Sequence, residues 1–304
     1  MKKIIFDTDI GGDCDDTGAL AIVHRACEAG LCELLCVTVS TVNPWSSACA
    51  DAINRYYGRV VPIGKTARCP ANEAPPEKFL RWYGKHIADR FPNDYLPEGG
   101  RAPIEAVRLL RRTLAENRGE KITMMVIGSF VNLCDLLKSE ADDLSPLSGK
   151  ELVRSQVELI SLMGGRFADE KNPDVDVEWN IRLDIESARF VFEQCPVPIA
   201  VSHFDVGEKI KTGGVLIERE RQNPVAEAYE VHSHGNRFSW DPISAYYAIF
   251  GAGEIFTDSR RGRVCVNERG VTVFTAGEGL HCLIDCPDVD RAARRLDELM
   301  LGQV

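Results

Sequence analysis

Short apolar runs alternate along the chain with stretches in which apolar positions recur at a helical period. The stretches typical of helices are residues 16–29, Ala48–Tyr57, Ile104–Glu116, Phe130–Lys138, Ile185–Glu193 and Asp241–Phe250. The runs typical of buried strands are Ile4–Phe6, Leu34–Val39, Val60–Ile63, Ile122–Ile127, Val157–Leu162, Pro198–Val201 and Val271–Phe274. This alternation predicts an α/β fold with a mostly parallel, mixed central sheet flanked by helices. Ligands of such sheets bind beyond the carboxyl ends of the strands.

Two segments do not follow this alternation. Residues 66–102 are rich in proline and glycine and predict a long loop with one helix, and residues 205–240 are polar and irregular. No repeat, low-complexity segment or shift in composition marks a boundary between domains. We therefore expect a single domain over residues 1–304.

The composition excludes several classes of protein. The chain is 44% hydrophobic and 27% charged, as is usual for a soluble globular protein. Its net charge of −10 argues against nucleic acid or an anionic membrane as the main partner. No run approaches the ~20 apolar residues of a membrane span, and the start MKKIIFDTD is too short and too acidic for a signal peptide, so we expect a cytoplasmic protein. The eleven cysteines show no paired zinc-binding spacing, and we expect most of them to be reduced.

Five carboxylates lie within ten residues, between the first predicted strand and the first predicted helix: Asp7, Asp9, Asp13, Asp15 and Asp16. One or two of them could cap the helix, where aspartate is favoured. The remaining charges repel one another unless a cation lies among them, and hard oxygen ligands suit Ca²⁺ or Mg²⁺. A calcium EF-hand fits poorly, because the twelfth position of such a loop would be Gly18 rather than glutamate. The pattern therefore predicts a metal site of another kind.

Three later segments supply further polar groups at strand or helix ends. The carbonyl of Ile127, at the end of a predicted strand, could serve as a hard oxygen ligand for a cation. Asp241 precedes a proline, which is typical of a helix start, and Trp240 could belong to the core or present its face to a flat ligand ring. The amides and carboxylates of the third segment match the hydroxyls of a sugar, although an ordinary polar loop would look the same. These residues are Asn172, Glu178, Asn180 and Asp184.

Taken together, the segments DTDIGGDCDD, VIGSFVNL, the GG…ExN…D stretch and WDP resemble the nucleoside hydrolase family of the inosine–uridine-preferring type, over roughly residues 2–280. The resemblance implies a Rossmann-like nucleoside hydrolase fold and Ca²⁺-dependent hydrolysis of the N-glycosidic bond of ribonucleosides. It further implies a role in purine or pyrimidine salvage and a homodimer or homotetramer.

The resemblance also implies a role for each motif residue. Asp9 would bind calcium and act as general base on a metal-bound water. Asp16, the Ile127 carbonyl and Asp241 would complete the metal site. Asp7 would support the acidic loop from behind. The residues implied to bind the ribose are Asp15, Asn43, Asn172, Glu178 and Asn180.

The chain departs from the family pattern in two places. Asp9 and Asp15 are separated by IGGDC, two residues more than usual, and this leaves Asp13 without a role. Trp240 stands where many members have a histidine that protonates the departing base; an indole can stack on a purine but cannot donate a proton as an imidazole does. His232 and His234 are candidate acids, and either could instead be structural or solvated.

Two other classes of function remain open. A Mg²⁺-dependent phosphatase could use Asp7 or Asp9 as its nucleophile, but it would need a phosphate-binding Lys or Arg and a hydroxyl early in the loop. A nucleoside- or ribose-binding protein without catalytic activity could keep the polar groups of Asn172, Glu178 and Asn180. It would bind ligand without releasing free base.

Overall fold

The computed structural model describes residues 1–73, 82–167 and 175–304. Its strands are β1 (Lys2–Thr8), β2 (Cys32–Val39), β3 (Ile63–Lys65), β4 (Ile104–Glu105), β5 (Ile122–Val126), β6 (Val157–Met163), β7 (Ile199–Ser202), β8 (Lys211–Thr212), β9 (Arg237–Phe238), β10 (Thr257–Asp258), β11 (Gly262–Val266), β12 (Thr272–Ala276) and β13 (His281–Asp285). Its helices are α1 (Asp15–Glu28), α2 (Ser46–Tyr56), α3 (Tyr83–Arg90), α4 (Ala106–Glu116), α5 (Val131–Lys138), α6 (Gly149–Gln156), α7 (Trp179–Leu183), α8 (Ile185–Gln194), α9 (Phe204–Gly207), α10 (Gly214–Arg219), α11 (Pro224–Ser233), α12 (Trp240–Phe250) and α13 (Val289–Met300).

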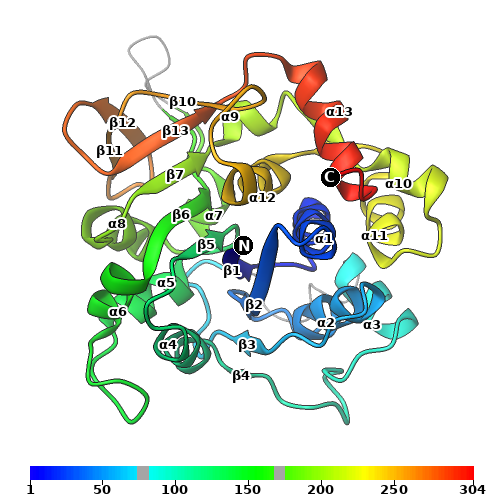
Figure 1. Ribbon diagram of the computed structural model, residues 1–304, viewed down its shortest axis with the longest axis horizontal. Helices are drawn as coiled ribbons and strands as arrows, with labels where there is room; N and C mark the ends of the chain where they lie inside the picture. Colours follow the sequence, from blue (N-terminus) through cyan, green and yellow to red (C-terminus); the bar gives the residue numbers. More distant parts are fainter. Residues whose placement is uncertain (74–81, 168–174) are drawn as a thin grey trace.

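A mixed sheet runs through the molecule in the order β12-β11-β13-β7-β6-β5-β1-β2-β3-β4, with β10 paired to β13 (Figure 1). The pairs from β13 to β4 in this order are parallel, whereas β11 pairs with its neighbours in the antiparallel sense. The chain moves from β1 through β2 and β3 to one edge and returns beside β1 with β5. The point where strand order reverses is therefore the carboxyl end of β1, which is where such sheets bind ligands. The predicted α/β class is confirmed.

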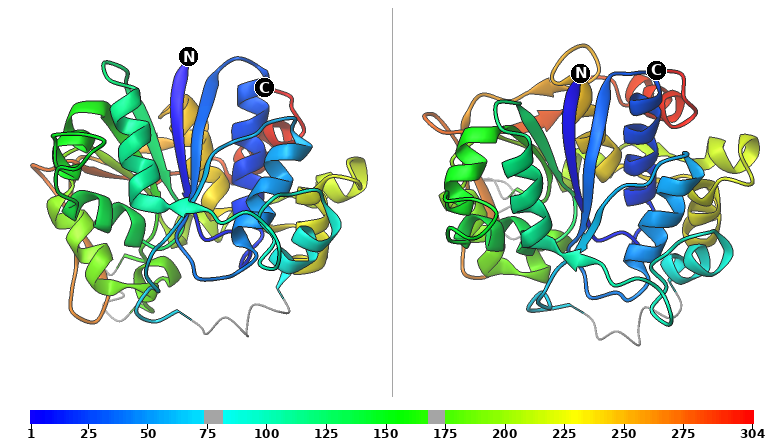
Figure 2. Two further views of the ribbon diagram at one scale, coloured as in Figure 1. Left: turned by 90° about the horizontal axis from the view of Figure 1, so that it is seen from below. Right: turned by 60° about the horizontal axis from the view of Figure 1, so that its bottom comes forward.

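Helices cover both faces of the sheet, as Figure 2 shows around β1 and β2. Successive residues of β1 point to opposite faces. Ile4 and Phe6 pack in one hydrophobic cluster with α1, α2, α11, α12 and α13, and Ile5 packs in a second cluster with α4, α5, α6 and α8. Burial on both faces explains why the central strands read as continuous apolar runs.

The structure corrects several predicted bounds. Residues 205–240 contain α9, α10 and α11, which the sequence analysis described as irregular. Strand β3 begins at Ile63 rather than Val60, because Val60 is 83% exposed and Pro62 has no N–H to donate to a ladder. Helix α12 begins at Trp240, one residue before the predicted start.

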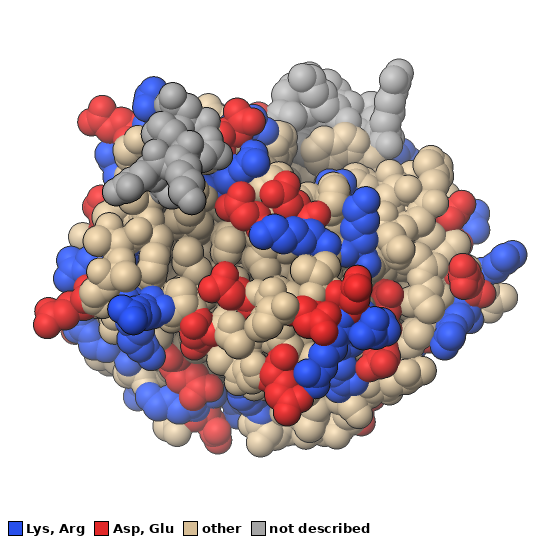
Figure 3. Space-filling view, turned by 90° about the horizontal axis from the view of Figure 1, so that it is seen from above, with Lys and Arg blue, Asp and Glu red and all other residues tan. Residues whose placement is uncertain are grey.

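Acidic and basic side chains intermingle on the face shown in Figure 3, without a continuous basic patch. None of the described helices combines the length and the apolar character that a membrane span requires.

Candidate active site

A cavity of about 540 Å³ opens at the carboxyl ends of β1, β5 and β6. This volume is in the range of small-molecule sites. Its lining combines carboxylates, aromatic rings and one guanidinium group. The lining residues are Asp9, Gly12, Asp13, Asp15, Asp16, Trp82, Tyr83, Ile127, Met163, Glu178, Trp179, Asn180, Phe204, Val231, His232, Arg237, Trp240 and Asp241.

Three buried carboxylates form the acidic centre of the cavity. Oxygen atoms of Asp15, Asp16 and Asp241 all lie within 4.8 Å of one another. Asp15 and Asp16 begin α1, and Asp241 lies in the first turn of α12. Burial raises the pKa of all three carboxyl groups well above the ordinary value, and the charges of neighbouring aspartates, Asp13 at Asp15 and Asp15 at Asp16 and Asp241, raise it further.

The groups that contact this acidic centre are neutral. Both backbone N–H groups at the start of α12, those of Trp240 and Asp241, donate to Oδ2 of Asp15 at 3.1 Å. Asp15 therefore caps α12 from the other end of the chain, which explains the early start of that helix. The Thr8 hydroxyl donates to Asp16. No ion pair involves these three carboxylates within the described ranges, so a set of hard oxygen donors with uncompensated negative charge fits a Ca²⁺ or Mg²⁺ ion.

Asp9 lies beside this centre rather than within it. It follows β1, is partly exposed, and lines the same cavity, but it is not among the carboxylates that lie within 4.8 Å of one another. Its charge contributes to the raised pKa values of Asp16 and Asp241. Burial raises the pKa of Asp9 itself to about 8, and the charge of Glu73 adds to the effect. A carboxyl group with a pKa near neutrality is suited to proton transfer.

Asp7 lies behind the cavity and does not line it. It is 1% exposed, and its Oδ2 accepts hydrogen bonds from the Thr38 hydroxyl at 2.5 Å and from Asn132 Nδ2 at 2.7 Å. Burial raises its pKa to about 7 despite these bonds. A supporting role for Asp7 stays a prediction.

The Ile127 carbonyl and Asn180 contact each other. Asn180 Nδ2 donates to the Ile127 carbonyl at 2.9 Å and lies 3.2 Å from the Met163 sulfur. Because these contacts occupy the amide donors, the amide oxygen is the group of Asn180 that remains for a ligand hydroxyl. The Ile127 carbonyl keeps a second lone pair, which a cation could use.

Glu178 caps α7. Its carboxylate accepts the backbone N–H groups of Asn180 at 2.9 Å, Gly165 at 3.0 Å and Ile181 at 3.2 Å. Burial nevertheless raises its pKa above the ordinary value. These bonds fix one carboxylate at the cavity wall. Asp184, by contrast, caps α8 and pairs with Arg68 outside the cavity.

The structure leaves two of the predicted ribose contacts open. Asn172 lies outside the described residues. Asn43 is 1% exposed and does not line the cavity; its side-chain oxygen accepts the Trp45 N–H at 3.0 Å. It packs beneath the acidic loop, where a Cβ at Gly11 would lie 2.7 Å from its Nδ2. The φ of +112° at Gly11 also favours glycine there.

Aromatic rings form another wall of the cavity. Trp240 stacks on Phe204 with ring centroids 5.4 Å apart, and its indole N–H donates to the Phe204 carbonyl at 3.0 Å. Trp82, Tyr83 and Trp179 also line the cavity. Aromatic faces of this kind can bind the flat ring of a nucleobase.

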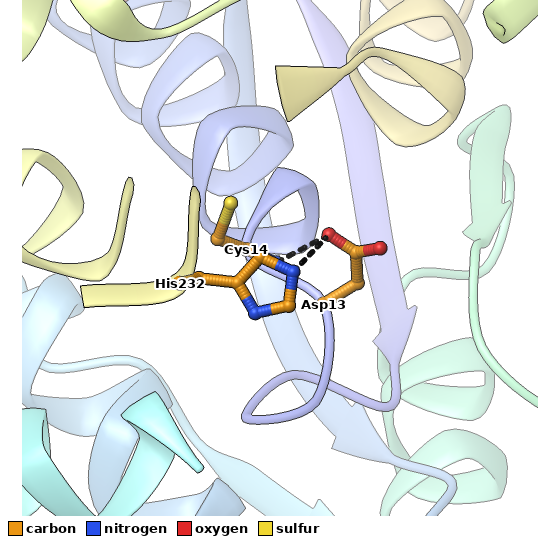
Figure 4. Close-up of side chains that lie close together, drawn as sticks. All are labelled: Asp13, Cys14 and His232. Carbon is orange, nitrogen blue, oxygen red and sulfur yellow. Dashed lines mark hydrogen bonds and ion pairs between the residues drawn. The ribbon is translucent and has the colours of Figure 1, made fainter. Parts of the chain in front are cut away.

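Asp13, which the resemblance left without a role, lies in an ionic cluster at the same cavity. Arg237 Nε donates to its two carboxylate oxygens at 2.9 and 3.0 Å. His232 Nε2 lies 3.3 Å from Asp13 Oδ1 (Figure 4). Cys14 lies beside them, but Arg237 already neutralises Asp13, so this group fits a metal ion less well than the three buried carboxylates do.

The two candidate histidine acids differ in position. His232 lines the cavity, whereas His234 is exposed, ends α11 in a left-handed conformation and does not line it. Burial lowers the pKa of His232 below its ordinary value, although the Asp13 charge opposes the shift. Sequence reasoning did not identify Arg237, Phe204, Tyr83 or Trp179 as site residues. One feature of the sequence could have indicated Arg237: the additional negative charge of Asp13 in the lengthened loop requires a positively charged partner.

Comparisons with known proteins agree with this geometry. The family described as inosine-uridine preferring nucleoside hydrolase matches residues 4–295. The inosine-uridine preferring nucleoside hydrolase from Bacillus anthracis is similar in structure, with a TM-score of 0.74, 18% identity, and coverage of 99% of this chain and 100% of that one. An inosine-guanosine nucleoside hydrolase has a TM-score of 0.73 and 16% identity, with 99% of each chain covered.

A further similar structure is the type III effector protein XopQ complexed with adenosine diphosphate ribose. It has a TM-score of 0.74 and 17% identity, and covers 100% of this chain and 94% of that one. Among curated proteins, none matches the chain in sequence. The structural similarities, at these identities, establish the fold. Because the family match spans nearly all of the sequence, the chain belongs to the inosine-uridine preferring nucleoside hydrolase family.

Proposed function

We propose that this protein hydrolyses the N-glycosidic bond of ribonucleosides to free base and ribose, with Ca²⁺ as its cofactor. One observation carries the proposal: Asp15 and Asp16 lie close to Asp241, which comes from a distant part of the chain. These carboxylates lie where the strand order of the sheet reverses, in a chain that belongs to the nucleoside hydrolase family. The carboxylates of Asp9, Asp16 and Asp241 and the carbonyl of Ile127 would hold the cation. When bound, Ca²⁺ lowers the pKa of water and orients the sugar diol.

The protein's own groups act on the water and on the sugar. Asp9, which lines the cavity beside the acidic centre, takes the proton of the attacking water. Cleavage of the bond builds positive charge on the ribose, and the surrounding carboxylates stabilise that charge. Asp15, Glu178 and the amide oxygen of Asn180 accept hydrogen bonds from ribose hydroxyls, while Trp240 stacks on the base. Asn43 and Asn172 remain predicted ribose contacts.

Release of ribose from a panel of ribonucleosides tests the proposal. We expect release in CaCl₂, loss of release in EGTA, and recovery when calcium is restored. Asp16→Asn is expected to reduce turnover at least a hundredfold without unfolding the protein. The matched control is Asp297→Asn, which removes a mostly buried carboxylate that accepts the Gly213 N–H outside the cavity. Equal turnover in the Asp16 and Asp297 variants would reject the metal assignment.

The same assay separates the alternatives. Phosphate release from phosphate monoesters, restored by Mg²⁺ rather than Ca²⁺, would favour the phosphatase. A binding protein without turnover has one specific argument in its favour, which is the similarity to a protein solved with adenosine diphosphate ribose. That function predicts calorimetric binding of ribose-containing ligands with no free base released. Salvage, a cytoplasmic location, a single domain and a homodimer or homotetramer stay predictions.

A further inference from the structure

We propose that Arg237, held by Asp13, recognises the base and selects 6-oxopurine ribonucleosides. This inference rests on the proposed nucleoside hydrolase function. It assigns a role to Asp13, the additional acidic residue of the loop, and to Arg237, the positively charged partner of Asp13.

The geometry of the guanidinium carries the proposal. Nε and Nη2 of Arg237 face the Asp13 carboxylate, which occupies one edge of the planar group. The guanidinium carbon lies 5.1 Å from the centre of the Trp240 ring and 5.3 Å from that of Phe238. Within residues 1–73, 82–167 and 175–304, no hydrogen bond involves Nη1. Because arginine has five N–H donors, the Nη1/Nη2 edge keeps donors for a ligand in the cavity that Arg237 lines.

A free guanidinium edge recognises a particular class of base. Hypoxanthine and guanine present two adjacent acceptors, O6 and N7, and two parallel N–H donors of arginine match this pair. Adenine presents N7 beside an amino group, which is itself a donor, and pyrimidines have no N7. Aromatic side chains, among them Tyr83 and Trp179, also line the cavity that would hold this base. The combination therefore favours inosine and guanosine over adenosine and uridine.

The charge of Arg237 has a second effect on the same base. The departing purine gains electrons as its bond to the ribose breaks, and a guanidinium at N7 and O6 stabilises that negative charge. Arg237 stays protonated throughout the working pH range, so this stabilisation needs no proton transfer. Asp13 acts as a positioning residue, because it orients the guanidinium without contacting the base. His232 contacts the opposite side of the cluster through the same carboxylate.

Selectivity between substrates tests the inference. The ratio of kcat/KM for inosine to that for adenosine is measured in the full-length wild type and in Arg237→Met, Arg237→Lys and Asp13→Asn. Arg237→Met is expected to lower this ratio about 5- to 150-fold, which is the discrimination that a bidentate arginine gives. Arg237→Lys keeps the charge but lacks the paired donors, so it should lose most of the selectivity as well. Arg118→Met, at an exposed position near the other end of β5, is the control.

A modified substrate isolates the contact itself. In 7-deazainosine, N7 is replaced by carbon, so in calorimetric titrations the wild type should bind it more weakly than inosine while Arg237→Met should barely distinguish the two. This coupling between one atom of the substrate and one side chain is not expected from a residue that only holds the loop. Circular dichroism verifies that each variant is folded. An unchanged inosine-to-adenosine ratio in folded Arg237→Met would overturn the inference.

Two further measurements keep the inference separate from the proposed function. p-Nitrophenyl riboside has a leaving group that needs no stabilisation, so its hydrolysis by the wild type reports on the metal and ribose portions of the site. Calorimetric binding of inosine and adenosine gives the selectivity without turnover. Absence of ribose release from both p-nitrophenyl riboside and inosine would reject the proposed function, whereas equal binding of the two nucleosides by the wild type would reject the role of Arg237.

Discussion

Replacing Asp241 by asparagine should change the stability of the protein in opposite directions with and without calcium. The Asp241 carboxylate lies within 4.8 Å of both Asp15 and Asp16. Two unit charges at that distance repel by about 3 kcal/mol at an effective dielectric constant of ~20. The raised pKa values mean that proton uptake already relieves part of this repulsion. We therefore expect Asp241→Asn to stabilise the calcium-free protein by about 1–3 kcal/mol.

Calcium reverses the sign of the effect that Asp241→Asn has on stability. A ligand at about a thousand times its Kd stabilises the native state by about 4 kcal/mol, and the variant lacks one ligand of the site. For a chain of 304 residues, the unfolding entropy is about 0.6 kcal/mol/K, so each kcal/mol shifts Tm by about 1.6 °C. Thermal unfolding followed by circular dichroism should therefore show the variant about 2–5 °C above the wild type in EGTA and below it in excess CaCl₂.

Asp297→Asn is again the matched control, because the effect of this substitution on Tm should be the same in both buffers. The reasoning would be refuted if Asp241→Asn lowered Tm in EGTA and left the calcium-induced shift at its wild-type size. Such a result would mean that Asp241 is neither repelled by Asp15 and Asp16 nor involved in binding the cation.

Three further predictions concern other parts of the molecule. Burial lowers the pKa of His24 to about 4, so as the pH falls the unfolded chain takes up the His24 proton before the folded protein does. The free energy of unfolding should therefore fall by ~3 kcal/mol between about pH 6.5 and about pH 4. Urea titrations should show a smaller fall in His24→Phe. Asn180→Leu frees the Ile127 carbonyl and removes the amide oxygen, so steady-state kinetics should show kcat reduced at least tenfold together with weaker calcium binding. Arg111→Met leaves the carbonyl groups of Ser145 and Leu147 without their donor, which should cost about 1–3 kcal/mol in urea unfolding without changing kcat at low temperature.

The parts of the fold that sequence reasoning predicted are those with continuous burial. Strands β1, β5 and β6 lie between two layers of helices, so each is an unbroken apolar run. Strand β11 alternates buried and exposed residues, with Cys265 exposed between buried Val264 and Val266, and is too short for that pattern to stand out. Helices α9 and α10 are four and six residues long, which is too short for a helical period to be recognised.

The sequence predicted the part of the candidate site in which several negative charges lie close together. The crowding of Asp15 and Asp16 indicated a cation, and the family resemblance supplied Asp241. Neither pattern nor resemblance indicated that Asp15 would cap α12 or that the amide of Asn180 would be bound to the Ile127 carbonyl. These contacts join segments far apart in the sequence, and no local preference encodes them.

The cap that Asp15 provides for α12 has a consequence for synthesis of the protein. It joins residues 225 and 226 positions apart, and closing a loop of that length has an entropy cost of about 5 kcal/mol. A nascent chain therefore cannot assemble the acidic centre until α12 has left the ribosome, however early α1 folds. Calcium affinity would then appear late and all at once, so that metal uptake reports the completion of folding of a newly made chain.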